Sequence, residues 1–180
     1  MNFNNYFIVG TTGPRNLHNA KDTYIQIQKT IKHLELGRAL QLQNSTIQNN
    51  KPLAIMSGFA EGWDEIIAKV AIDLNYPLIA IVPNKSYGSY YWGKNSISGT
   101  NRIDEFHSLL AKAIYVEYVC NGIYGTINEK RLHANFVRNQ RIVDIGNYFI
   151  AYDLKQNEKS NGTRDCTRRI LASKKPYILI

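Results

Sequence analysis

The sequence predicts a Rossmann-like α/β fold, a three-layer sandwich with a mostly parallel sheet of five to six strands. Three observations predict it. Short apolar runs alternate with helical patterns along the 180 residues. The runs are continuous, as in strands covered on both faces. The helices between them imply right-handed crossovers, which connect parallel strands. The length suits a single domain over residues 1–180.

Six apolar runs are the expected strands. Each is short, and each ends at a turn or a polar stretch; Pro83, for example, ends the third run. The expected strands are residues 6–9, 53–56, 78–82, 114–119, 148–152 and 177–180.

Five segments with apolar residues at helical spacing are the expected helices. The first places Ile27, Ile31 and Leu34 on one face, and the second has the clearest pattern, around Trp63 and Ile67. The expected helices are residues 19–43, 62–75, 102–112, 131–145 and 164–173. The expected loops are residues 41–51, 84–101, 121–130 and 155–161.

The composition indicates which binding partners and which cellular compartment to expect. The net charge of +8 makes nucleic acid, nucleotides and anionic proteins candidate partners, although scattered lysines also suit an ordinary soluble surface. No apolar run approaches the roughly 20 residues of a membrane span, and the N-terminal residues lack a signal-peptide pattern. Two distant cysteines, Cys120 and Cys166, suit a reducing cytoplasm and not a disulfide framework. The four histidines lack metal-ligand spacing, so we expect no metal site. We also expect no cofactor.

Three loops rich in small residues follow strands or open helices. They are "GTTGPR" after the first strand, "SGFAEGWDE" after the second, and "NGTRD" at the start of the last helix. Any one of them alone is an ordinary turn or cap. In a parallel sheet, however, all three lie at the same edge, where backbone can approach a ligand and helix N-termini attract phosphate. None matches the P-loop or the dinucleotide fingerprint.

The motifs "VGTTGPR", "SGFAEGWDEIIAKVA", "RNQRIVDIGNYFIAYD" and "NGTRDCTRRI", in that order, resemble the SLOG superfamily. This superfamily groups the YpsA-like and YspA-like proteins, the LOG phosphoribohydrolases and DNA-processing protein A. The resemblance covers about residues 6–180 and is strongest to the YpsA/YspA-like branch. It implies a fold that binds nucleotides or nucleotide-derived ligands, including ADP-ribose-like signals in some members.

Site roles follow from these motifs. Gly10, Thr11 and Gly13 would cradle the ligand, and Arg15 is either a bidentate phosphate ligand or a surface residue. Asp64 favours the helix dipole or accepts a ribose hydroxyl. The resemblance adds the "RN" pair on the fourth helix and a Gly-Thr pair at a phosphate-binding helix start. The expected ligand-binding residues are Gly10, Thr11, Thr12, Gly13, Arg15, Ser57, Gly58, Gly62, Asp64, Trp92, Arg138, Asn139, Gly162, Thr163 and Asp165.

The loop "NKSYGSYYWGKN" is a candidate lid. Its rings could stack on a base, and we expect at least two of them to pack on the core instead. The rings are Tyr87, Tyr90, Tyr91 and Trp92.

Binding is preferred to catalysis. The LOG enzymes carry a motif close to PGGxGTxxE, but here the Pro-Gly-Gly is missing and Cys166 occupies the glutamate position. The leading hypothesis is a sensor or sequestering protein for a nucleotide-derived small molecule. The alternatives are an N-glycosidase using Asp64 or Glu61, and a single-stranded nucleic-acid binder. Exposed apolar edges in such domains favour a homodimer.

Overall fold

The computed structural model describes residues 1–43, 51–121, 128–154 and 161–180. These residues contain six strands in the order β4-β3-β2-β1-β5-β6, and every neighbouring pair is parallel. The strands are β1 (Phe7–Thr12), β2 (Leu53–Ser57), β3 (Leu78–Val82), β4 (Tyr115–Tyr118), β5 (Tyr148–Ala151) and β6 (Tyr177–Leu179). The predicted fold class is confirmed.

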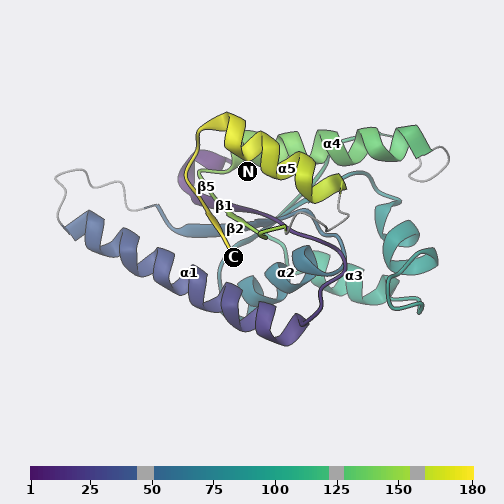
Figure 1. Cartoon of the computed structure of the whole chain (residues 1–180), viewed down its shortest axis with the longest axis horizontal. Coiled ribbons are helices and arrows are strands. Elements are labelled where there is room, and N and C mark those ends of the chain that lie inside the picture. Colours follow the sequence, from purple (N-terminus) through teal and green to yellow (C-terminus); the bar gives the residue numbers. More distant parts are fainter. Residues whose placement is uncertain (44–50, 122–127, 155–160) are drawn as a thin grey trace.

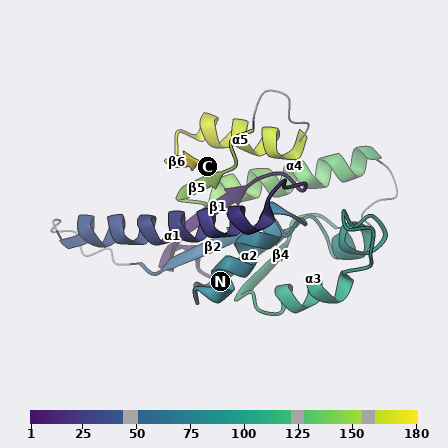
Figure 2. The same ribbon diagram turned by 60° about the horizontal axis from the view of Figure 1, so that its bottom comes forward.

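Helices cover both faces of the sheet. In Figures 1 and 2, α4 and α5 lie on one side of the sheet, and α1, α2 and α3 lie on the other. The helices are α1 (Ala20–Gln43), α2 (Trp63–Asp73), α3 (Ile103–Leu110), α4 (Asn128–Ile145) and α5 (Asn161–Ser173). None of them, within the described ranges, combines the length and apolar character needed to cross a bilayer.

Two hydrophobic cores result from the alternation of side chains along the strands. On one face, Val9 and Ile55 pack with Ile31 and Ile67 of the helices α1 and α2. On the other face, strand residues such as Ile8 and Met56 pack with residues of α4 and α5. Because successive strand residues point to opposite faces, both cores draw on the same central strands, which fixes three layers.

The edge strands differ from the sequence prediction. Every residue of β2 and β3 is buried, but Tyr177, Ile178 and Leu179 of β6 are 41%, 38% and 43% exposed. The expectation that all strands are covered on both faces is therefore wrong for β6, and β4 is only partly buried. Both strands lie at the ends of the sheet, where helices cover less of the surface.

Element boundaries shift where they matter for function. β1 extends to Thr12, because Thr11 and Thr12 pair with Ile150 and Ala151. α5 begins at Asn161 and not at residue 164, so its first turn includes the Gly-Thr pair. A π-helical turn, Ser89–Lys94, lies inside the expected loop 84–101.

The other expected loops lie mostly outside the described residues. These loops are 41–51, 121–130 and 155–161. In the second of these loops, α4 begins at Asn128, which is earlier than the expected start at residue 131.

Candidate functional site

A cavity of about 200 Å³ lies at the carboxyl edge of the sheet, beside β1. β2, β3 and β4 extend from one side of β1, and β5 and β6 extend from the other. Strand order therefore reverses here, and ligands of open α/β sheets bind at such a switch point. We call this cavity the central pocket. It is lined by Thr11, Thr12, Gly13, Arg15, Ala60, Asp64, Tyr87, Tyr91, Asn135, Arg138, Asn139, Ile142, Gly162 and Thr163.

The three loops expected to meet at one edge do meet there. The end of β1 contributes Thr12 and Gly13, the β2–α2 loop contributes Ala60, and the first turn of α5 contributes Gly162 and Thr163. The convergence predicted from the sequence is confirmed.

Arg138 and Asp64 form a buried pair in the central pocket. Their exposed fractions are 9% and 6%, and Arg138 Nη1 lies 3.6 Å from Asp64 Oδ2. Arg138 also donates to the Gly58 carbonyl at 3.0 Å and to Asn139 Oδ1 at 3.1 Å. A Cβ at residue 58 would lie 2.7 Å from both Arg138 Nη1 and Asp64 Oδ2. A side chain at this position would therefore displace the Arg138–Asp64 pair, which packs directly against the Gly58 backbone.

Burial changes the pKa of the Asp64 carboxyl. Desolvation raises its pKa to about 6, and the nearby Arg138 charge and the Ala60 amide moderate this rise. The group therefore changes charge close to neutral pH, inside the pocket.

This pKa predicts a pH-dependent stability. A carboxyl with a raised folded-state pKa binds its proton more tightly in the folded protein, so stability is lost as the pH rises from about 4 through about 6. We expect Asp64 to cost about 2 kcal/mol of unfolding free energy at neutral pH relative to pH about 4. Chemical denaturation of the wild type and Asp64→Asn across this range measures it. The difference between the two proteins should change with pH, whereas parallel curves would contradict the assignment.

The first turn of α5 presents its N-terminus to the central pocket. The positive end of the helix dipole, at this N-terminus, favours anions. Asn139 Nδ2 donates to the Gly162 carbonyl and to Asp165 Oδ2, both at 3.0 Å, and so fixes this turn to α4. Among the residues that the structure describes, a Cβ at Gly162 would meet no atom within 4 Å.

The loop after β1 is held against α2. A Cβ at Gly13 would lie 2.2 Å from the buried Trp63 ring, and the Trp63 amide donates to the Pro14 carbonyl at 3.1 Å. Gly62 has φ +82°, and a Cβ there would lie 1.9 Å from the Arg15 carbonyl oxygen. Gly13 therefore lets its loop lie against the Trp63 ring, and Gly62 lets the loops after β1 and β2 pack backbone against backbone.

Arg15 lines the pocket, whereas Glu61 anchors a neighbouring loop. Arg15 Nη2 donates to Glu61 Oε2 at 2.7 Å, and its guanidinium lies 4.1 Å from the centre of the Tyr91 ring. Glu61 is fully buried and accepts from Ser96 Oγ at 2.5 Å and from the Ile97 amide at 2.9 Å. Its contacts tie residues 96–97 to the β2–α2 loop, and it does not line the central pocket.

Nine of the fifteen expected ligand-binding residues line the central pocket, and the other six do not. Ser57 Oγ donates to the Asp64 carbonyl at 2.8 Å and supports the start of α2. Trp92 is fully buried and donates to the Phe59 carbonyl at 3.0 Å. Its ring belongs to the core, as does that of Tyr87, so two lid rings pack there as expected. The six are Gly10, Ser57, Gly58, Gly62, Trp92 and Asp165.

Five pocket residues were absent from the expected set. Tyr87 and Tyr91 belong to the lid loop, and Asn135 lies one turn before Arg138 on α4. The Asn135 side-chain oxygen is buried without a hydrogen-bond partner in the described part of the chain. Helical spacing from Arg138 could have identified Asn135. Ala60 and Ile142 carry no such signal.

The position of the LOG glutamate holds no acid. Cys166 is 1% exposed and packs in the core between α5 and the sheet, and burial raises the pKa of its thiol to about 12. Arg141, three residues after Arg138 on α4, pairs with Glu117 at 2.7 Å and does not line the central pocket.

The fold and the pocket define a Rossmann-like α/β domain with a cavity at the switch point of its sheet. Two solved structures share this fold, both of DNA processing protein A. The protein from Streptococcus pneumoniae is 16% identical, with a TM-score of 0.59 over 98% of this chain and 51% of that one. The protein from Helicobacter pylori, whose structure addresses its single-stranded DNA binding mode, is 14% identical, with a TM-score of 0.58 over 99% of this chain and 67% of that one.

This likeness shows the fold and agrees with one part of the predicted resemblance. It supports a fold like that of DNA processing protein A and does not extend to the YpsA-like or LOG branches. The chain spans about half the length of the S. pneumoniae protein. No family model and no curated protein matches the sequence.

Proposed function

We propose that the central pocket binds the phosphorylated sugar of a nucleotide, which would make residues 1–180 a single nucleotide-binding domain. The observation that supports this most is the meeting of a buried arginine with the N-terminus of α5 in one cavity at the switch point. The cavity of about 200 Å³ is smaller than typical pockets for whole small molecules, which begin at about 300 Å³. It therefore suits part of a ligand, with the remainder outside.

Each group has a role in this proposal. The amides of Gly162 and Thr163, at the positive end of α5, bind phosphate oxygens. Arg138 supplies positive charge beside them. Asp64 accepts a ribose hydroxyl when it is ionised, above pH about 6. Tyr91, already stacked on Arg15, offers a ring at the entrance of the pocket.

Two ligand classes present such a group, a free nucleotide derivative resembling ADP-ribose and a single strand of nucleic acid. The small molecule is the hypothesis from the sequence. The strand is favoured by the net charge of +8 and by the single-stranded DNA binding of the H. pylori neighbour. We place the strand first for these two reasons.

Glycosidic cleavage is a weaker proposal. Glycosidases commonly use two carboxylates around the reacting bond, and among the described residues that line the central pocket Asp64 is the one acid. Glu61 is engaged by Arg15, Ser96 and Ile97. Buried Cys166 stands where the LOG motif has its glutamate.

Calorimetric titration with thymidine monophosphate, a short oligothymidylate and ADP-ribose tests the proposal. Gly162→Asp places a negative charge where the phosphate would lie, at a position with open space and at a helix N-terminus that favours acids. We expect it to fold and to bind at least about tenfold more weakly. Gly37→Asp, in an exposed turn of α1 with no atom near its Cβ, is the matched control and should bind normally.

Equal affinities of these two variants would contradict a phosphate site at α5. Chromatography of the recovered ligand separates binding from hydrolysis, because an enzyme would release free base. Binding of the oligonucleotide should weaken steeply with salt.

A homodimer remains a prediction. β6 is an exposed edge strand with apolar side chains, and such edges are templates for strand pairing. Sedimentation equilibrium measures the mass in solution, and a monomer at all concentrations would contradict the prediction.

A further inference from the structure

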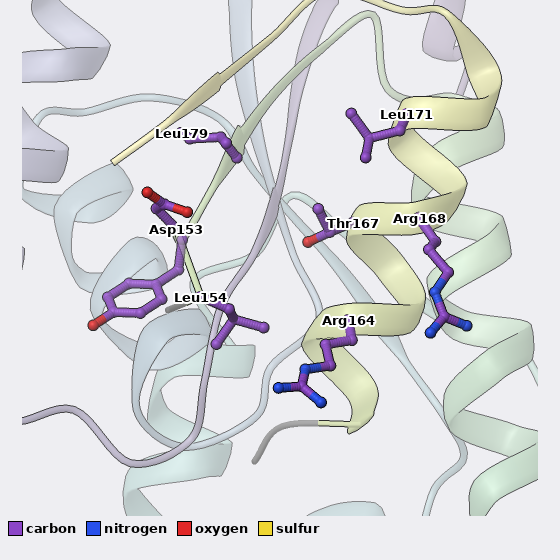
Figure 3. Close-up of a pocket in the computed structure, with 8 residues that line it drawn as sticks. Asp153, Leu154, Arg164, Thr167, Arg168, Leu171 and Leu179 are labelled. Carbon is purple, nitrogen blue, oxygen red and sulfur yellow. The ribbon is translucent and has the colours of Figure 1, made fainter. Parts of the chain in front are cut away.

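A second, larger cavity of about 450 Å³ lies beside the central pocket, between α5 and the ends of β5 and β6. We call it the lateral pocket. Figure 3 shows Leu171 and Thr167 on α5 facing Leu179 and Leu154 across the space. Tyr152 completes its apolar lining. Its volume is within the range of small-molecule sites, about 300–1,000 Å³.

Polar groups stand among these apolar walls. Thr167 Oγ1 is buried and has no hydrogen-bond partner in the described part of the chain. Arg164 and Arg168, one turn apart on α5, and Asp153 also line the cavity. A slot with apolar walls, two arginines and one carboxylate in its lining matches the chemistry of a nucleobase attached to a phosphate, because the arginines pair with phosphate and the carboxylate accepts from a base edge. Bases are held by stacking on aromatic rings and guanidinium planes and by hydrogen bonds at their edges.

The two pockets are adjacent. The Tyr152 amide donates to the Thr12 carbonyl at 2.9 Å, and Thr12 lines the central pocket whereas Tyr152 lines the lateral one. The first turns of α5 likewise pass from Thr163, in the central pocket, to Arg164, in the lateral one. The linings of the two pockets are therefore neighbours along both β1–β5 and α5.

We propose that the lateral pocket receives the base of a second nucleotide, joined through its phosphate to the nucleotide held in the central pocket. The ligand is then a single strand of nucleic acid that is read as at least two consecutive units. This proposal rests on the proposed function of the central pocket, and it identifies which of the two ligand classes that pocket serves.

Fluorescence anisotropy or calorimetry with thymidine monophosphate, the thymidine dinucleotide with a 5′-phosphate, and ADP-ribose tests the proposal. The dinucleotide should bind about tenfold more tightly than the mononucleotide, the gain expected from one stacked base. Leu171→Glu introduces an acid at the wall of the lateral pocket, and we expect it to abolish this gain and leave mononucleotide binding unchanged. Leu171 is 50% exposed, and Leu36→Glu, at a residue of α1 that is 58% exposed and lines neither pocket, is the matched control.

A second variant, at an exposed residue, tests the same proposal in case Leu171→Glu does not fold. Arg164→Ala removes one exposed charge at the lateral pocket. Its control, Lys29→Ala, removes one charge from the exposed face of α1. Only Arg164→Ala should reduce the dinucleotide gain.

The outcomes separate the two proposals. Equal affinity for mononucleotide and dinucleotide overturns the lateral site and leaves the central site standing. Tighter binding of ADP-ribose than of the dinucleotide, weakened by Leu171→Glu, overturns the strand in favour of a pyrophosphate-linked ligand. Failure of all three probes to bind the wild type overturns the central site and the lateral site together.

Discussion

Replacing Arg138 with methionine is expected to lower the free energy of unfolding by about 3–5 kcal/mol at neutral pH. The side chain is 9% exposed, and its removal leaves the Asp64 carboxylate, 6% exposed, without its cation. It also leaves the Gly58 carbonyl without the donor that lies 3.0 Å away. Without its cation the buried carboxyl must either bear the cost of its desolvation or take up a proton, and the lost hydrogen bond to Gly58 adds to the deficit in either state.

The loss should depend on pH in a definite direction. Arg138 lowers the pKa of Asp64 against the larger effect of burial, so its removal raises that pKa further. Below the new value the carboxyl is neutral, and the deficit in Arg138→Met should shrink as the pH falls towards about 4. Adding Asp64→Asn to this variant should recover part of the lost stability at neutral pH.

Arg141→Met provides the control on the same helix. Arg141 pairs with Glu117, but its side chain is 38% exposed, so its loss should cost at most about 1 kcal/mol. Urea denaturation monitored by circular dichroism measures all of these values. If Arg138→Met costs no more than Arg141→Met, or if its deficit is independent of pH, the buried ion pair does not organise the pocket.

The second large effect is expected at Gly62. Gly62→Ala would place a Cβ 1.9 Å from the Arg15 carbonyl oxygen, on a backbone with φ +82°. Both the clash and the strained dihedral must be relieved by moving the loop after β1, and we expect a loss of about 2–4 kcal/mol. Because Gly13 and Arg15 line the central pocket, nucleotide affinity should fall as well.

Gly37→Ala is the control for this substitution. Gly37 lies within α1 and is exposed, and its Cβ would meet no atom within 4 Å. Alanine favours helix over glycine, so this variant should gain about 0.5–1 kcal/mol. Thermal unfolding of the two variants should shift in opposite directions. A small effect at Gly62 would show that the two loops are free to separate.

The fold could be predicted from the sequence because its central elements are locally consistent. The apolar run at Leu78–Val82 is the observed β3, and the helical pattern around Trp63 and Ile67 is the observed α2. The burial of the edge strands was predicted less accurately. The run at Tyr177–Leu179 is apolar but exposed, and the position of a strand in the sheet order is not encoded in its own residues.

The site was predicted at the level of loops and less well at the level of side chains. Backbone turns such as Gly13 and Gly162 were located because three glycine-containing loops, each ordinary by itself, fall at the same edge of a parallel sheet. The side chains of Glu61 and Trp92 depend on partners far away in the chain, Arg15 and Phe59. Their direction is fixed by tertiary packing, which one sequence does not reveal. Ile142 and Ala60 reach the pocket for the same reason, without any local pattern.

The most direct test of the central pocket is an amide chemical-shift titration of the nitrogen-15-labelled protein with a short single-stranded oligonucleotide. The largest shifts should occur at the amides of Thr12, Gly13, Gly162 and Thr163, which surround one cavity. Smaller shifts should follow at Arg164 and Thr167 in the lateral pocket. Shifts confined to other surfaces, with these amides unmoved at saturation, would contradict nucleotide binding at the switch point of the sheet.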